Sequence, residues 1–139
     1  MPSPGQNWKT NMSDHELKRL IEAADRAITA EDFDALMDFY AEDTALVVKP
    51  GMVATGKAAI RKAFVAIAAH FKNTMKVRQG RMEVIEGADT ALVLMETLLD
   101  VPGQPDPIVR RATYVFRKSQ TGRWLCAVDN SYGTALLDA

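Results

Sequence analysis

TALVLMETLL, residues 90–99, is the stretch of sequence that decides the fold. Side chains of a strand alternate between the two faces of a sheet. Here both alternating sets are largely apolar, with Val93, Met95 and Leu99 on one face and Leu92, Leu94 and Leu98 on the other. A sheet covered on one side only shows polar residues on its second face. We therefore expect both faces to be covered, one by helices of the same chain and the other by a second subunit.

The second half of the chain consists of strand-forming runs separated by short turns. Four strands are predicted, over residues 75–86, 90–101, 108–118 and 123–131. Gly80 interrupts the first of them, which indicates a bulge that bends the sheet. Because the connecting turns are short, we expect these strands to form an antiparallel meander.

The first half of the chain has helical periodicity instead. Apolar residues at three- and four-residue spacing predict helices over residues 17–28, 32–40 and 57–71, with a short strand over residues 44–49. Three helices followed by an antiparallel meander predict the α+β class, with the helices packed against one face of a bent sheet.

Composition limits the classes of protein to which the chain can belong. Its 139 residues suffice for one domain, which we place at residues 13–133 between a flexible arm (1–12) and a tail (134–139). With 17 Lys and Arg against 18 Asp and Glu, it lacks the basic excess of nucleic-acid modules. The longest apolar run, Ala63 to Ala69, is too short to span a bilayer. A single cysteine excludes an internal disulfide and favours the cytoplasm.

One motif imitates a nucleotide-binding site. Residues 51–57, GMVATGK, match the G-x-x-x-x-G-K pattern of a phosphate-binding loop. However, Ala58 stands where a hydroxyl should hold magnesium, and the strand order is not that of such enzymes. We interpret the motif as a turn that orients the third helix. His15 and His70 have no second ligand at a suitable spacing, so neither a metal nor an organic cofactor is expected.

Several motifs, taken in order, resemble the nuclear transport factor 2-like superfamily, and within it the SnoaL-like and ketosteroid-isomerase-like branch. They are residues 31–43 (EDFDALMDFYAED), 50–51 (PG), 55–60 (TGKAAI) and 123–131 (RWLCAVDNS). The resemblance implies a cystatin-like, cone-shaped α+β barrel in which a strongly curved antiparallel sheet wraps around three N-terminal helices. It also implies a deep apolar pocket, and a homodimer through the outer sheet face.

The sequence lacks the catalytic residues of ketosteroid isomerase at the positions that the resemblance gives them. That enzyme uses an Asp base and an oxyanion hole made of Tyr and a protonated Asp. The flanking motifs place the base at Val48 or Lys49, the tyrosine at Ala24 and the oxyanion aspartate at Thr113. None of these residues supplies the required group, so steroid isomerisation by that mechanism is not expected.

The last hairpin supplies the candidate pocket residues. A two-residue turn at residues 120–121 places Arg111 opposite Asn130. The resemblance gives Thr113 a pocket-facing position. The pocket face then carries Arg111, Thr113, Trp124, Cys126, Val128 and Asn130.

The opposite face is predicted to carry Arg110 and Asp129, as an ion pair in the interface between subunits. A one-residue bulge would reverse this assignment and turn Asp129 into the pocket. Asp129 remains a candidate because it resembles the base that SnoaL-like cyclases carry near their last strand.

Two functions fit these patterns. The first is a pocket that binds a largely apolar carbonyl or carboxylate compound, with Arg111 on the negative oxygen and Asn130 as a second donor. In the alternative to this role, Arg111 only pairs with Glu96 or Glu83 of neighbouring strands. The second function is an enzyme of the polyketide-cyclase or dehydratase type, with Asp129 as its general acid and base.

Overall fold

The computed structural model describes residues 15–74 and 76–138, and the predicted arm at residues 1–12 lies outside them. The helices are α2 (Glu16–Ala30), α3 (Phe33–Met37) and α4 (Lys57–His70), followed at the end of the chain by the 3₁₀ helix η2 (Gly133–Asp138). The strands are β1 (Tyr40–Lys49), β2 (Met52–Thr55), β3 (Lys76–Gly87), β4 (Thr90–Asp100), β5 (Ile108–Lys118) and β6 (Trp124–Asn130).

All of the strands belong to one sheet, in the order β2-β1-β6-β5-β4-β3. The four predicted strands of the meander are present, and their neighbours pair antiparallel. β1 pairs parallel with β6, so the first and last strands of the chain are neighbours inside the sheet, whose edges are β2 and β3. β2 was not predicted, because only four residues form it. It occupies Met52–Thr55, so the imitation of a phosphate-binding loop is interrupted by a strand.

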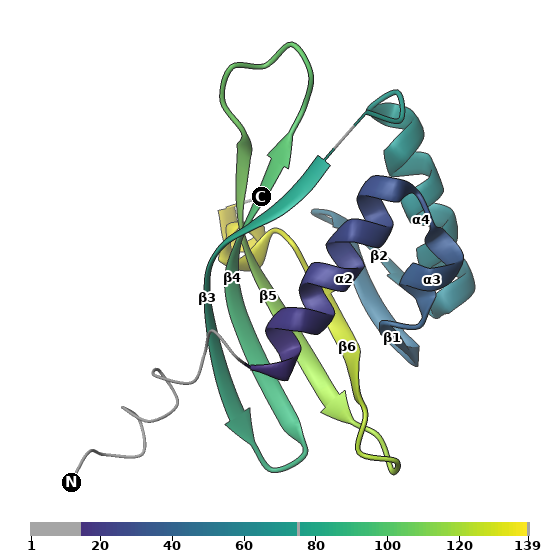
Figure 1. The fold of residues 1–139 in the computed structure, drawn as a ribbon, viewed down its shortest axis with the longest axis vertical. Coiled ribbons are helices and arrows are strands. Elements are labelled where there is room, and N and C mark those ends of the chain that lie inside the picture. Colours follow the sequence, from purple (N-terminus) through teal and green to yellow (C-terminus); the bar gives the residue numbers. More distant parts are fainter. Residues whose placement is uncertain (1–14, 75, 139) are drawn as a thin grey trace, which may run out of the picture.

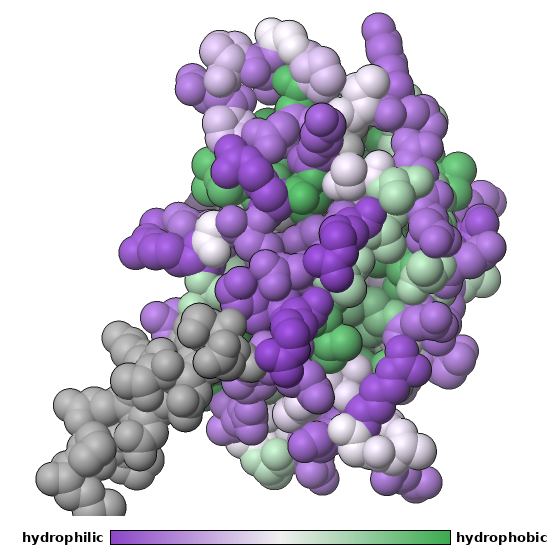
Figure 2. All heavy atoms as spheres, in the orientation of Figure 1, coloured by the Kyte–Doolittle hydropathy of each residue, from purple (hydrophilic) through white to green (hydrophobic). Residues whose placement is uncertain are grey.

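The three helices pack on one side of the sheet, and α2 crosses it (Figure 1). α2 begins where the His15 side chain accepts a hydrogen bond from the amide of Leu17. Its apolar face buries Leu17 and Ile21 completely against the sheet. Burying each such side chain contributes roughly 1.5–3 kcal/mol. The helix-covered side is mainly polar at its surface, with apolar atoms visible between the charged side chains (Figure 2).

The sheet bends where the sequence predicted it. The register between β3 and β4 shifts between Gln79 and Met82, which confirms the bulge at Gly80. A Cβ on Gly80 would lie 2.9 Å from the Cβ of Glu96, so the strands approach too closely here for a larger residue. The curved sheet and its helices confirm the predicted α+β class, with the helices packed against one face of a bent sheet.

The outer face of the sheet leaves apolar side chains in contact with solvent. Leu92 and Leu94 of β4 are 36% and 39% exposed, and Ile85, Val109 and Val128 are also exposed. On the inner face of the same strand, Val93 and Met95 are buried. Within the described residues, no helix is both long and apolar enough to cross a membrane.

Candidate functional site

An open cavity of about 760 Å³ lies on the concave side of the sheet. Its walls come from α4, from the β1–β2 hairpin and from the inner faces of β3, β4 and β5. Apolar side chains dominate them, among others Leu46, Val48, Ala54, Ala63, Ile67 and Leu99. A cavity of this size, with apolar walls and a few polar groups, is typical of a site for a small organic molecule.

Asp129 lines this cavity from β6 and is 5% exposed. Burial raises the pKa of its carboxyl from 3.8 to about 6, although the hydrogen bond from Tyr40 acts in the opposite direction. The Tyr40 hydroxyl donates to Oδ2 of Asp129 at 2.6 Å. Tyr40 is itself fully buried beneath the site, so it fixes one carboxyl oxygen in place. The other oxygen, Oδ1, accepts no hydrogen bond from the described part of the chain.

Asp25 adds a second buried carboxyl to the cavity, from α2. Burial raises its pKa from 3.8 to about 7, partly offset by a hydrogen bond from the Gln79 amide and reinforced by the negative charge of Asp129. Sequence reasoning missed Asp25. A signal was available, because Asp25 follows Ile21 by four residues and precedes Ile28 by three, which places it on the apolar face of the helix.

Three further polar side chains reach the cavity from the inner face of the sheet: Thr97, Arg110 and Tyr114. Burial and the charge of Asp129 raise the pKa of Tyr114 well above 10, so its phenol stays neutral and is able to donate a hydrogen bond. Lys49, Lys62 and His70 also line the cavity, and all three are exposed to solvent.

The structure corrects the predicted orientation of four candidate residues. Arg111, Thr113, Val128 and Asn130 do not line the cavity and belong to the outer side of the sheet. Asn130 holds the start of η2, because its Oδ1 accepts hydrogen bonds from the amides of Tyr132 and Gly133, both at 3.1 Å. Its Nδ2 donates to the Thr113 hydroxyl at 3.2 Å.

Arg111 lies directly across from Glu96 of β4, but Glu96 forms its ion pair with Arg81, at 3.4 Å. The pKa of Glu96 is lowered, first by hydrogen bonds from Arg81 and then by the charge of Arg111. Arg111 is exposed, and a ligand inside the cavity does not reach it.

Two local irregularities of the last hairpin explain the error. The hairpin turns through three residues, 120–122, instead of two, since the Ser119 amide donates to the Arg123 carbonyl and Gly122 adopts φ +81°. A second shift follows, because Val115 pairs with Val128 but Phe116 pairs with Cys126. The extra residue turns Asp129 inward, the outcome that we expected of a bulge.

On β5 the inward residues are the even-numbered ones, which include Arg110, Ala112 and Tyr114. Arg110 and Asp129 therefore both line the cavity and do not form the expected ion pair on the outer face. The resemblance had placed Thr113 in the pocket, one residue before the cavity-lining Tyr114.

Trp124 and Cys126 face inward as expected, but they are packed in the core beside the cavity. Trp124 is 5% exposed, with the ammonium of Lys118 5.0 Å from its ring centre. Cys126 is fully buried, and burial raises the pKa of its thiol well above 9. A neutral thiol without access to solvent is not a nucleophile.

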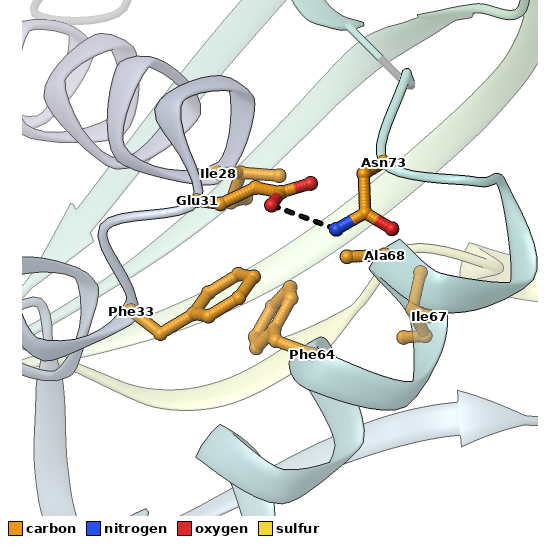
Figure 3. A pocket seen from close by; sticks show the side chains of 7 residues that line it. All are labelled: Ile28, Glu31, Phe33, Phe64, Ile67, Ala68 and Asn73. Atoms are coloured by element: carbon orange, nitrogen blue, oxygen red, sulfur yellow. Dashed lines mark hydrogen bonds between the residues drawn. The ribbon is translucent and has the colours of Figure 1, made fainter.

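A second hollow lies between α2, α3 and α4, and its volume of about 10 Å³ holds roughly one water molecule (Figure 3). Phe33 and Phe64 stack beneath it at 6.5 Å, and Asn73 donates a hydrogen bond to Glu31 across it. This hollow is too small for a ligand. Among the described side chains, no three His, Cys, Asp or Glu groups gather closely enough to bind a metal ion.

Solved structures with the same fold extend over most of this chain. An NTF2-like protein with a cystatin-like fold from Novosphingobium aromaticivorans superimposes with a TM-score of 0.72 at 19% identity, over 96% of this chain and 94% of that one. A protein of unknown function with a cystatin-like fold from Nostoc punctiforme gives 0.72 at 18% identity, over 82% and 85% of the two chains. ActVI-ORFA from Streptomyces coelicolor gives 0.68 at 16% identity, over 82% and 92%. At these identities the likeness establishes the fold alone.

Sequence comparison identifies the family. No curated protein sequence matches the chain. A family model described as a SnoaL-like domain matches residues 17–127, from the first turn of α2 into β6. Because this match covers most of the sequence, the chain belongs to the SnoaL-like domain family.

Proposed function

We propose that the protein is an acid–base enzyme that moves a proton at the carbon next to a carbonyl group, in a largely apolar compound bound in the cavity. The observation that carries this proposal is the position of Asp129. It is a buried carboxyl with one oxygen held by Tyr40 and the other without a partner among the described residues, at the wall of an open cavity of about 760 Å³. A buried carboxyl with a purely structural role would need neither an open cavity beside it nor an oxygen without a hydrogen bond.

The ionisation of Asp129 suits proton transfer at neutral pH. With a pKa of about 6, most Asp129 carboxyls are ionised at pH 7, and their basicity exceeds that of an ordinary aspartate. The apolar walls take up the body of the substrate and remove water from the reacting carbon. Oδ1 of Asp129 then takes the proton, and the electrons of the C–H bond move into an enolate. The same oxygen returns the proton to carbon in the second step.

Asp25 suits the complementary role. Its pKa of about 7 leaves a large share of its carboxyls protonated at neutral pH. A protonated carboxyl in an apolar site donates a hydrogen bond to a carbonyl oxygen and stabilises the charge that develops there. The neutral phenol of Tyr114 is a second donor in the same cavity. The two carboxyls thus have different proton affinities, as an acid–base pair requires.

Proton exchange with solvent tests this proposal. 1-Tetralone is a suitable probe because it has an apolar body and exchangeable protons beside its carbonyl. In D₂O near neutral pH, we expect the protein to accelerate deuterium uptake, measured by NMR. Asp129→Asn should lower that rate by about 100-fold or more. Asp106→Asn, at an exposed position of the β4–β5 loop, is the matched control and should retain the rate. Equal rates for Asp129→Asn and the unaltered protein would contradict the proposal.

A second function is a pocket that binds such a compound without changing it. The apolar walls favour it, as does the absence of the ketosteroid-isomerase residues: Val48 and Lys49 line the cavity but supply no carboxylate. In that case 1-tetralone binds without catalysed exchange. For both functions we propose a cytoplasmic location, which is consistent with the buried, unpaired Cys126.

A further inference from the structure

We propose that Arg110 and Thr97 form a subsite for a carboxylate, so that the compound bound in the cavity is an apolar carboxylic acid. This inference rests on the proposed function only in taking the cavity as the substrate site. It gives that substrate a charged group, which the acid–base chemistry alone does not require.

Arg110 and Thr97 lie at one level of the sheet. They are direct partners across β5 and β4, and both line the cavity. Tyr114, which pairs with Asp129, follows Arg110 by four residues on the same strand. At about 3.3 Å per residue, the backbones of these two levels are about 13 Å apart. Arg110 and Asp129 thus lie at different levels of the cavity, as a substrate with separate charged and reacting ends requires. Asp25 lies at the level of Arg110, because its hydrogen-bond partner Gln79 pairs with Thr97.

The guanidinium of Arg110 is held in place without being neutralised. Its central carbon lies 4.6 Å from the ring centre of Tyr132, and the Tyr132 hydroxyl donates to the Val48 carbonyl at 3.4 Å. Within the described residues, Arg110 forms no ion pair, whereas Arg78, Arg81 and Arg117 each pair with a carboxylate. Stacking on a ring leaves the N–H groups at the edge of the guanidinium free to donate.

Thr97 supplies an independent observation. It is 5% exposed, and among the described groups its buried hydroxyl has no hydrogen-bond partner. Thr97 also lies close enough to the phenol of Tyr114 to lower its pKa, against the dominant effect of burial. A buried hydroxyl without a partner is uncommon in native proteins, and a ligand oxygen in the cavity would provide one.

The shape of these donors favours a carboxylate. A guanidinium edge presents two parallel N–H groups that match the two oxygens of a planar carboxylate, and the Thr97 hydroxyl adds a third donor. Lys49 and Lys62 at the exposed rim add positive potential, but solvent screens them, and no aromatic ring of the described residues holds their ammonium groups. Arg110 is therefore the group that determines where the negative charge is placed.

Binding of matched probes tests the subsite. The probes are 2-naphthoate and its neutral amide, 2-naphthamide, with dissociation constants measured by calorimetry at pH 8. We expect the protein to bind 2-naphthoate about tenfold more tightly than the amide. Arg110→Met should remove this preference. The matched control is Arg111→Met, which deletes the same charge one residue away on the outer face and should keep the preference. Thr97→Val, which preserves the shape of the side chain, should reduce the preference for 2-naphthoate by a smaller factor than Arg110→Met does.

The outcomes separate this inference from the proposed function. An equal affinity for the two probes, no binding of either, or an equal loss in Arg111→Met and Arg110→Met would overturn the subsite. Exchange of 1-tetralone depends on Asp129 and involves a ketone without a carboxylate. Catalysed exchange without a preference for 2-naphthoate refutes the subsite alone. An Arg110-dependent preference without catalysed exchange refutes the enzyme and supports the subsite.

Discussion

Replacing Asp129 by Asn should stabilise the protein at neutral pH. Asp129 is buried, and its pKa rises from 3.8 to about 6 on folding. The folded state therefore binds this proton more tightly than the unfolded chain does. By linkage, the free energy of unfolding falls as the pH rises from about 4 to about 6, and the full penalty is present above that range. Asparagine has nearly the same shape and no charge, so the variant avoids the penalty.

The size of the effect follows from the change in pKa. A shift of about two units corresponds to about 3 kcal/mol at pH 8, and to about 0.5 kcal/mol at pH 4. The bond from Tyr40 survives, because the side-chain carbonyl of Asn accepts from the same hydroxyl. The free energy of unfolding of Asp129→Asn, relative to that of the unaltered protein, should thus be about 2 kcal/mol higher at pH 8 than at pH 4.

Urea unfolding, followed by tryptophan fluorescence at several pH values between 4 and 8, measures this difference. Asp100→Asn is the control, because a hydrogen bond from Arg78 lowers the pKa of that carboxyl. Loss of the Asp100 carboxylate should lower the free energy of unfolding, and should lower it more at pH 8 than at pH 4. A difference between Asp129→Asn and the unaltered protein that is the same at pH 4 and pH 8, or that shrinks as the pH rises, would refute the reasoning.

Three further changes have defined outcomes. Tyr40→Phe removes the hydrogen bond that favours ionised Asp129, so the pH at which catalysed exchange begins should rise; an unshifted profile contradicts this positioning role. Gly133→Ala should lower the free energy of unfolding in urea by at least about 2 kcal/mol, since φ is +56° and a Cβ would lie 1.9 Å from the carbonyl oxygen of Arg111; a cost below 1 kcal/mol refutes this packing. We propose that the exposed apolar outer face pairs two copies of the chain, so Leu94→Glu should convert a dimer to a monomer in sedimentation velocity. An unaltered protein that sediments as a monomer contradicts that proposal.

The fold was predictable because many residues encode it redundantly. Each helix depends on several apolar side chains at helical spacing, such as Leu17 and Ile21 in α2, and no single misjudged position changes the assignment. The strands of the meander are likewise marked by turns on both sides. β2 escaped prediction because four largely exposed residues carry no such redundancy.

The site was less predictable because the facing of a strand depends on single residues. One bulge after Cys126 decides whether Asp129 or Asn130 reaches the cavity, and the local sequence gives no sign of it. The same sensitivity exchanged Arg110 for Arg111 on β5. Tyr40 lies far from Asp129 in the sequence, so their contact follows from the parallel pairing of β1 with β6.

The pH dependence of deuterium uptake by 1-tetralone, expressed as kcat/KM, examines the acid–base pair most directly. We expect a narrow bell with its maximum between the pKa of Asp129, about 6, and that of Asp25, about 7. Uptake begins as Asp129 loses its proton and declines as Asp25 loses its own. A rate that only climbs with hydroxide concentration, and that Asp129→Asn leaves unchanged, would show that the cavity carboxyls do not perform the chemistry.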